Sequence, residues 1–286
     1  MTHDAPIWYD ETLYNDYRQS LRVDRVRHRE QTAHQDLIIF ENKRFGRVLA
    51  LDGVIQTTEG DEYVYHEMLV HMPVLGHGRV KDVLIVGGGD GGALREVLRH
   101  ASVEHAVLVE IDASVIELCR EHLPKHSAGA FDDARAEIVI ADGAAFITET
   151  ERRFDVIIID STDPIGPGEV LFSEHFYDGC KRCLRPGGIL VTQNGVPSVQ
   201  GMEVTQSHQR LGAHFADVAF YLAPVPTYLG GFMAFGWASD DAGLRTPPPG
   251  ELAARYAAAG IATRYYNPDI HHAAFALPND VRVLMD

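Results

Sequence analysis

The stretch from Val83 to Gly92 reads VLIVGGGDGG, four aliphatic residues followed by a turn of five glycines and one aspartate. A short aliphatic run of this kind is typical of a strand covered on both faces. Glycines let the backbone turn sharply and approach a ligand closely, because they carry no Cβ. Proteins that bind NAD, FAD or S-adenosylmethionine all use such a turn between a strand and a helix. The stretch therefore predicts a nucleotide-like ligand but does not distinguish among these three. A plain tight turn without a ligand remains an alternative.

The same combination of short strand and helix repeats along the chain. Aliphatic runs occur at 83–86, 106–109, 138–140, 156–159 and 189–191, and helices are expected between them at about 92–100, 113–122, 143–150 and 173–184. This alternation predicts an α/β fold with a Rossmann-like, methyltransferase-type doubly wound sheet. Segments near 217–221 and 232–238 are expected to add edge strands, and a helix is expected at 251–259.

The first 60 residues have a different pattern. Turn-forming residues separate three apolar runs; the runs are 37–40, 47–51 and 54–58, and the turns are 42–46 and Asp52-Gly53. This spacing predicts a small antiparallel sheet. Apolar residues at helical spacing between Tyr65 and Met72 then predict a helix that ends at Pro73. We therefore expect an N-terminal β-strand domain at 1–60 and a Rossmann-like catalytic domain at 61–286.

The chain of 286 residues carries a net charge of −16. This balance argues against nucleic acid as the main partner, because binding phosphates needs a basic surface, and it suits cationic small ligands. The longest aliphatic runs are far too short to cross a bilayer, and no secretion signal opens the chain. Cys119, Cys180 and Cys183 cannot form a disulfide framework, so we expect a cytoplasmic protein. We expect no metal site, because the histidines do not show ligand spacing.

Carboxylates follow the next two strands at the edge where open α/β sheets bind ligands. Glu110 ends the second strand, about 20 residues after the glycines, where a carboxylate can accept hydrogen bonds from both ribose hydroxyls of an adenosine. Asp142, followed by Gly143, ends the third strand and suits the adenine amino group. Together with the glycine turn, these strand ends predict recognition of an adenosine.

Asp90, inside the glycine turn, narrows the choice of ligand. A dinucleotide would place its pyrophosphate near the helix N-terminus, and Asp90 would repel it. The carboxylate of S-adenosylmethionine would meet the same repulsion. A ligand with a bare ammonium group there, such as decarboxylated S-adenosylmethionine, would suit Asp90, so Asp90→Asn should relax discrimination against the carboxylated form.

The fourth strand ends in Asp160, followed by Ser161, Thr162 and Asp163. A primary amine is protonated at neutral pH and must lose a proton before it can act as a nucleophile. One of the two aspartates could accept that proton while the other anchors a cationic substrate. Asp163-Pro164 can also be a plain turn opener. The glycine- and proline-rich stretch up to Glu169 indicates a mobile lid.

With these residues in view, the chain resembles the spermidine synthase family of aminopropyltransferases. The resemblance spans nearly the whole chain, and its matching segments are His34 to Glu41, Leu51 to Glu59, Asp61 to Glu67, Gly87 to Gly92, Asp160 to Pro167, Pro226 to Tyr228 and Arg264 to Pro268. Gly60 departs from the pattern, since many members have arginine there. We expect that change to alter turn geometry outside the pocket.

The resemblance implies a role for each matched residue. It makes Asp160 the proton acceptor and places Tyr65 close to the attacking nitrogen. The implied amine pocket comprises His66, Asp163 and Tyr228, and Asp90 holds the aminopropyl amine. The implied nucleoside site comprises Glu110, Asp142, Gly143, Gln35, Gln56 and Pro167. The family also implies a homodimer or homotetramer.

The activity that the resemblance implies is transfer of the aminopropyl group of decarboxylated S-adenosylmethionine to putrescine, which gives spermidine and methylthioadenosine. The donor is a co-substrate, so we expect no cofactor, and no metal is needed because a sulfonium is already a good leaving group. Two alternatives stay open. One is a polyamine N-methyltransferase that uses S-adenosylmethionine, and the other is a catalytically silent polyamine-binding protein. Cadaverine, agmatine or spermidine could also serve as acceptors.

Overall fold

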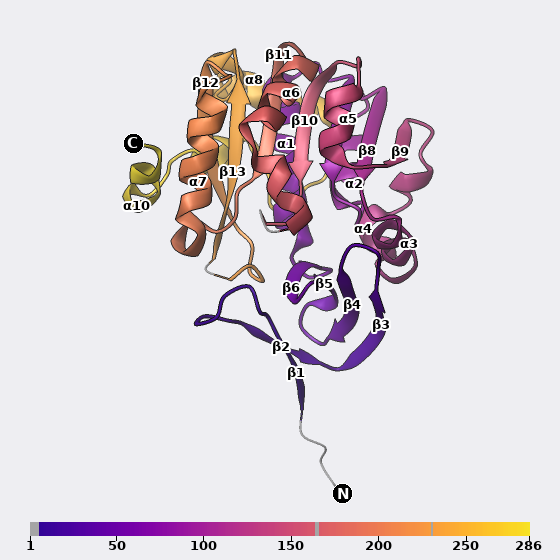
Figure 1. The fold of residues 1–286 in the computed structure, drawn as a ribbon. Coiled ribbons are helices and arrows are strands. Elements are labelled where there is room, and N and C mark those ends of the chain that lie inside the picture. Colours follow the sequence, from indigo (N-terminus) through magenta and orange to yellow (C-terminus); the bar gives the residue numbers. More distant parts are fainter. Residues whose placement is uncertain (1–5, 164–165, 230) are drawn as a thin grey trace, which may run out of the picture.

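A seven-stranded sheet forms the centre of the computed structural model, which describes residues 6–163, 166–229 and 231–286 (Figure 1). Its strand order is β12-β13-β11-β10-β7-β8-β9. The strands are β7 (Asp82–Gly87), β8 (His105–Glu110), β9 (Ala136–Ile140), β10 (Phe154–Asp160), β11 (Leu184–Gln193), β12 (Asp217–Pro224) and β13 (Phe232–Ser239). The five strands from β11 to β9 are parallel, whereas β13 pairs antiparallel with both β11 and β12. The Rossmann-like α/β prediction is confirmed.

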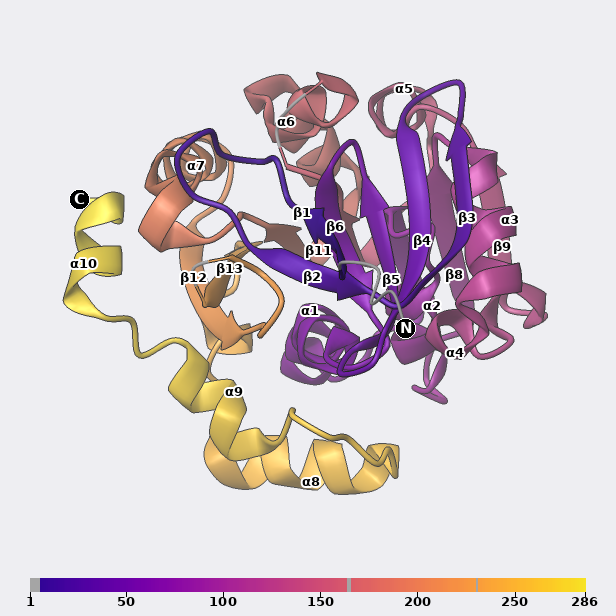
Figure 2. The ribbon, with the colours of Figure 1, turned by 90° about the horizontal axis from the view of Figure 1, so that it is seen from below.

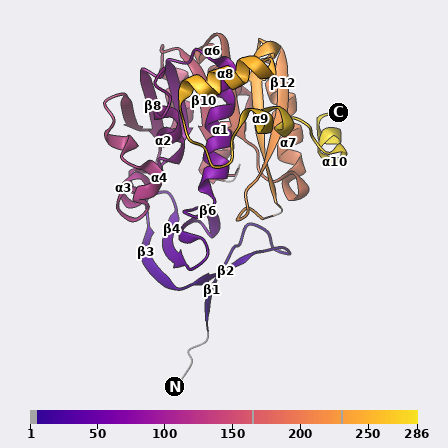
Figure 3. The same cartoon turned by 180° about the vertical axis from the view of Figure 1, so that it is seen from behind.

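Helices cover both faces of this sheet. One face packs against α1 (Glu62–His77), α2 (Gly92–Leu98), α8 (Pro249–Ala259) and α9 (Pro268–Ala274) (Figure 3). The other packs against α5 (Gly143–Glu149), α6 (Glu174–Cys183) and α7 (Pro197–Gly212). Along β7, Val83 and Ile85 join the first core while Leu84 and Val86 join the second. Burial on both faces explains why these strands are aliphatic at every position.

A four-stranded antiparallel sheet lies below the large sheet in Figure 1 and in front of it in Figure 2. Its strands are β3 (Arg25–Gln31), β4 (Asp36–Asn42), β5 (Gly46–Leu51) and β6 (Val54–Thr58). One of its faces packs on α3 (Ala113–His122), which α4 (Pro124–Ser127) follows. Its other face packs against the hairpin of β1 (Ile7–Asp10) and β2 (Ser20–Val23). The turn Asp52-Gly53 has φ values of 47° and 85°, as a tight hairpin turn requires. The predicted antiparallel sheet is therefore confirmed, and the β1–β2 hairpin adds to it.

Two details differ from the sequence-based expectations. Pro73 lies inside α1, which continues to His77 before Gly78 closes it in the left-handed conformation. Burial of Val74 and Leu75 offsets the hydrogen bond that a proline cannot donate. Strand β13 is not an edge strand, because it pairs on both sides and is buried almost throughout. The remaining C-terminal residues form α10 (Asn279–Arg282), and no helix in the described ranges is long and apolar enough to span a membrane.

Glu67 ties α1 to the C-terminal segment. Its carboxylate is buried and accepts hydrogen bonds from the backbone N–H groups of Arg264, Tyr265 and Tyr266, each at 2.8 Å. We expect Glu67→Gln to lower the free energy of unfolding by about 2–4 kcal/mol, because an amide group turns an N–H toward a backbone donor. Urea unfolding measures this change. Glu117→Gln, at an exposed position on α3, is the control, and a loss no larger than that of the control would contradict the expectation.

Candidate active site

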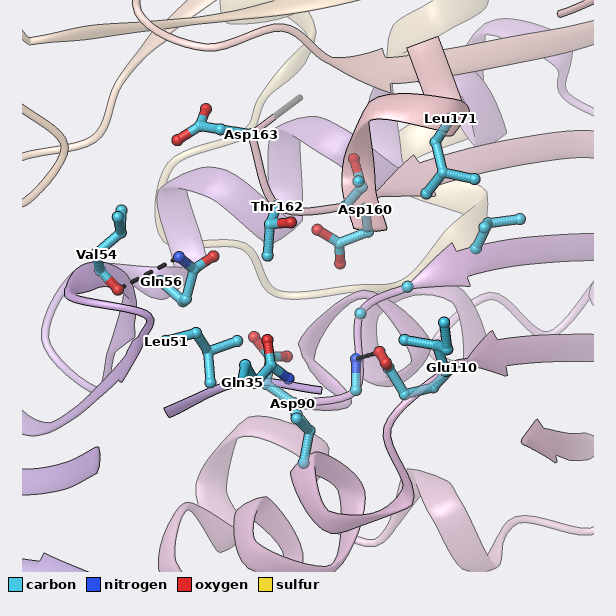
Figure 4. Close-up of a pocket in the computed structure, with 18 of the residues that line it drawn as sticks. Gln35, Leu51, Val54, Gln56, Asp90, Glu110, Asp160, Thr162, Asp163 and Leu171 are labelled. Carbon is cyan, nitrogen blue, oxygen red and sulfur yellow. Dashed lines mark hydrogen bonds between the residues drawn. The ribbon is translucent and has the colours of Figure 1, made fainter. Parts of the chain in front are cut away.

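A cavity of about 360 Å³ lies between the carboxyl ends of β7, β8 and β10 and the small N-terminal sheet (Figure 4). The large sheet contributes the glycine turn, Glu110 and Asp160, and the small sheet contributes Gln35 and Gln56. Because parallel strands end at one edge of a sheet, residues far apart in sequence converge there. Gly60 does not line the cavity; it packs against Phe45 instead.

The glycine turn fits against the end of β10. Gly87 and Gly88 have φ values of +82° and +71°, and the N–H of Gly88 donates to the carbonyl of Asp160 at 2.9 Å. A Cβ added to Gly87 would lie 2.2 Å from that carbonyl oxygen, and one added to Gly88 would lie 2.7 Å from Oδ2 of Asp160. Glycine is therefore required at both positions by conformation and by contact.

The two carboxylate oxygens of Asp160 have different surroundings. The hydroxyl of Tyr65 donates to Oδ1 at 2.7 Å, while Oδ2 is shielded from solvent and has no partner in the described part of the chain. Burial, with a contribution from Asp90, outweighs the lowering effects of His66 and Tyr65 and raises the pKa of Asp160 to about 6. The side chain is thus a carboxylate whose proton affinity is higher than usual.

His66 lies between two carboxylates. Its Nδ1 is 2.7 Å from Oε2 of Glu62, and its Nε2 is 3.5 Å from Oδ1 of Asp90. Burial alone would lower the pKa of His66, but Asp90 and Glu62 outweigh burial and raise it to about 10. The protonated imidazole in turn holds the pKa of Asp90 well below its usual range despite burial. Asp90 is therefore ionised and fixed in place, and its Oδ1 also accepts from the N–H of Gly92 at 2.6 Å.

The residues predicted to bind the nucleoside lie around the other half of the cavity. Glu110 accepts from the N–H of Gly89 at 3.2 Å, and burial raises the pKa of its carboxyl to about 7. Asp142 caps α5 through Oδ1, with Gly143 beside it in the cavity wall. Gln35 donates to Asp112 at 3.1 Å, and Gln56 donates to the carbonyl of Val54 at 3.3 Å. The side chain of Pro167 lies outside the described residues, as do residues 164 and 165.

A second, smaller cavity of about 60 Å³ continues from the first. Tyr65, Asp163 and Tyr228 line both cavities, and the Tyr228 hydroxyl donates to the carbonyl of Gln56 at 2.8 Å. The resemblance grouped His66 with Asp163 and Tyr228, but the structure brings His66 against Asp90 and not to this smaller cavity. The two cavities meet at Tyr65, whose hydroxyl holds Asp160.

The larger cavity has a predominantly acidic lining. Its lining contains six carboxylates, and no lysine or arginine occurs among the described residues that form it. The carboxylates are Asp52, Asp90, Glu110, Asp142, Asp160 and Asp163. His66 is the cation that this lining holds in place, and Asp90 and Glu62 already neutralise it. Such a surface favours a ligand with several positive charges and disfavours one with a carboxylate.

Comparison with known families agrees with this geometry. The model of the spermine/spermidine synthase domain matches residues 62–246, and the model of the spermidine synthase tetramerisation domain matches residues 7–59. The chain belongs to the spermine/spermidine synthase family. The resemblance seen in the glycine turn and in the stretch from Asp160 is therefore confirmed.

Relatives in this family match over nearly the full length. Polyamine aminopropyltransferase 1 of Pseudomonas aeruginosa is 60% identical over 273 residues, and the enzyme of Pseudomonas syringae is 58% identical over 273 residues, each alignment covering 96% of both chains. A crystal structure of a spermidine synthase in complex with the transition state analogue AdoDATO is 40% identical, with a TM-score of 0.92, and the match covers 98% of this chain and 96% of that one. The spermidine synthase of Thermotoga maritima gives a TM-score of 0.89 at 39% identity, covering 98% of this chain and 95% of that one.

Several residues that line the smaller cavity were not predicted from the sequence. The loop between β1 and β2 brings Glu11, Leu13 and Tyr14 to the smaller cavity, and α7 brings Gln200. Nothing local marks these residues, because an acidic, an aromatic or an amide side chain is ordinary in an exposed loop or helix. The packing of the hairpin on the small sheet brings the three loop residues to the site, and Gln200 comes from the first turns of α7.

Proposed function

We propose that the chain transfers the aminopropyl group of decarboxylated S-adenosylmethionine to putrescine, giving spermidine and methylthioadenosine. The observation that carries the proposal is the cavity lining with six carboxylates and no lysine or arginine among its described members. The donor has a sulfonium and an ammonium, and putrescine has two amino groups, so both substrates suit that surface. A ligand with an α-carboxylate would find no lysine or arginine among the described residues of that lining, and the cation of His66 is already neutralised by Asp90 and Glu62.

The reaction is a direct displacement. The lone pair of a neutral putrescine nitrogen attacks the methylene carbon next to the sulfonium, the carbon–sulfur bond breaks, and its electrons go to sulfur. Asp160 accepts the proton of the nitrogen through Oδ2, the oxygen without a hydrogen-bond partner among the described residues, while the Tyr65 hydroxyl holds Oδ1. Because burial brings the pKa of Asp160 closer to that of an ammonium, near 10, proton transfer is less uphill than to an ordinary aspartate.

The remaining site residues divide between the two substrates. Asp90, held by His66, would accept hydrogen bonds from the donor ammonium. The nucleoside part would contact Glu110 at the ribose and Asp142 with Gly143 at the adenine, and Gln35, Gln56 and Pro167 would complete its site. Asp163 and Tyr228 would line the acceptor side. No step requires a metal or a cofactor, because the sulfonium leaves as a neutral thioether.

The N-methyltransferase alternative differs from this proposal in the donor and the product. The protein is incubated with putrescine and either S-adenosylmethionine or its decarboxylated form, and the nucleoside product is identified by mass spectrometry. We expect methylthioadenosine from the decarboxylated donor. Formation of adenosylhomocysteine would support the methyltransferase, and tight putrescine binding without turnover would support a silent binding protein.

We also propose two domains, at 1–60 and 61–286, a homodimer or homotetramer, and a cytoplasmic location. The separate family matches to residues 7–59 and 62–246 support the division, and the description of the first as a tetramerisation domain supports assembly. The free, buried state of Cys119, Cys180 and Cys183 is what a reducing compartment favours. Light scattering of the purified protein measures the number of subunits.

The pH profile tests the role of Asp160. A base must be ionised, so we expect kcat/KM to fall below about pH 6, where Asp160 takes up a proton. The Tyr65 hydrogen bond lowers the pKa of Asp160, and Asp90 raises it. Tyr65→Phe should therefore move the acidic limb to higher pH, and Asp90→Asn should move it to lower pH. A limb at the same pH in both variants would assign it to another group.

A further inference from the structure

The smaller cavity ends at a set of acidic groups beyond Asp163. From Tyr65 and Tyr228 it extends to Tyr14 and Gln200, with Glu11 in its wall. Glu11 is buried, and its Oε2 accepts from the N–H of Ile55 at 3.1 Å. Glu11, Tyr14 and Gln200 line only this smaller cavity, whereas Asp163 lines both cavities.

The amide of Gln200 is fixed at this end by three contacts. Its Oε1 accepts from the N–H of Val196 at 2.7 Å, and its Nε2 donates to Asp163 at 2.9 Å and to Glu203 at 3.1 Å. Both amide protons therefore lie between two carboxylates. The neutral NH₂ group donates hydrogen bonds to both carboxylates but carries no positive charge. An ammonium group at this end would supply hydrogen-bond donors and a positive charge.

Glu203 is not part of the cavity lining but contacts two residues that are, since its Oε1 accepts from Gln200 and its Oε2 lies close to Gly195. Its Oε2 is shielded from solvent and has no hydrogen-bond partner in the described ranges. A Cβ added to Gly195, a residue of the cavity wall, would lie 2.7 Å from that oxygen. The hydroxyl of Tyr14 is also shielded and without a partner in those ranges. The glycine thus leaves Glu203 close to the space where the far end of an amine would lie.

The acidic groups at this end raise one another's pKa values. Burial, with a contribution from Asp163, raises the pKa of Glu203 to about 8, and burial also raises the pKa of Asp163. The same groups and Glu11 raise the pKa of Tyr14, after burial. A positive charge placed among these groups would favour the ionised forms of the carboxylates.

We propose that Glu203 is a specificity-determining residue that recognises the second positive charge of the acceptor amine, together with Asp163 and through the amide of Gln200. This inference rests on the proposed function, since it concerns the acceptor of that reaction. The amine enters with its reactive nitrogen at Asp160 and its far ammonium at Glu203. A monoamine of the same length would leave the far end unfilled.

The test compares two amines in two variants. Putrescine carries a far ammonium, whereas n-butylamine has the same four-carbon chain without one. Glu203→Gln keeps the shape of the side chain and removes its charge, and Glu117→Gln, exposed on α3, controls for net charge. Each enzyme is assayed with both amines, n-butylamine serving as substrate or as competitive inhibitor. Methylthioadenosine affinity is measured in parallel to show that the donor side is intact.

We expect Glu203→Gln to raise KM for putrescine about tenfold or more and to leave kcat within about twofold. The constants for n-butylamine should change less than about twofold, as should every constant of Glu117→Gln. Glu203→Asp, which keeps the charge, should restore most of the putrescine affinity.

Two results would overturn this inference and leave the proposed function intact. One is an unchanged KM for putrescine in Glu203→Gln, and the other is an equal loss with both amines, which would indicate a structural role. A parent enzyme that forms no methylthioadenosine with any amine would instead refute the proposed function, and this inference with it.

Discussion

Asp160→Asn is expected to lower turnover by a factor of about 10²–10⁴, because asparagine cannot accept the proton of the attacking nitrogen. Asparagine has the same shape and its side-chain oxygen can still accept from Tyr65, so the cavity should keep its form. Methylthioadenosine should therefore bind with nearly unchanged affinity. Steady-state kinetics with both substrates and calorimetric titration with methylthioadenosine measure the two effects.

Asp178→Asn is the matched control for this variant, since the Asp178 side chain is exposed on α6 and does not line the cavity. Its turnover should equal that of the parent. If Asp160→Asn kept turnover within about tenfold of the parent, Asp160 would not be the base. A parallel loss of methylthioadenosine binding would instead indicate that the asparagine disturbs the glycine turn, which contacts the Asp160 carbonyl.

Asp90→Asn is expected to have the second largest effect. It removes the charge that would face the donor ammonium, so kcat/KM for decarboxylated S-adenosylmethionine should fall by about 10- to 100-fold. The variant also leaves the cation of His66 without the partner that lies 3.5 Å from it. The local charge then becomes more positive, which favours the carboxylate of S-adenosylmethionine. Discrimination between the two donors should therefore decrease.

The measurement is the ratio of the dissociation constants of the two donors in parent and variant. Methylthioadenosine is the internal control, because it lacks the aminopropyl group and should bind equally to both. An unchanged ratio would show that Asp90 does not select against the carboxylate. A weaker methylthioadenosine complex would indicate damage to the turn, where Asp90 accepts from the N–H of Gly92.

Local pattern was sufficient to predict the central sheet and the carboxylates at its edge. The strand ending at Gly87 and the strand ending at Asp160 are aliphatic because both faces are buried, and that pattern is readable from sequence. Glu110 and Asp142 could be placed at strand ends because each follows a short aliphatic run in the sequence. The order of strands could not be predicted in this way, since the placement of β13 between β11 and β12 depends on contacts across the whole chain.

Other features depended on contacts between distant residues. The helix continues through Pro73 because packing of the following turn offsets the missing hydrogen bond. The pairing of His66 with Asp90 joins α1 to the glycine turn, and no local pattern predicts a contact between these two segments. Glu203 and Gln200 were not predicted from the sequence. The feature that singles them out is the side-chain amide of Gln200, which donates to both Asp163 and Glu203, and such a contact leaves no local sequence pattern.

The hairpin of β1 and β2 has a consequence for how this enzyme family diversifies. The ends of the large sheet carry the carboxylates that we propose bind the donor. The loop from Glu11 to Tyr14 lines the smaller cavity, which we propose for the acceptor, and reaches the larger cavity only through Thr12 and Leu13. A surface loop between two short strands tolerates substitution and insertion far better than the core strands do. Acceptor choice can therefore drift during evolution through a few loop residues while the donor chemistry stays conserved.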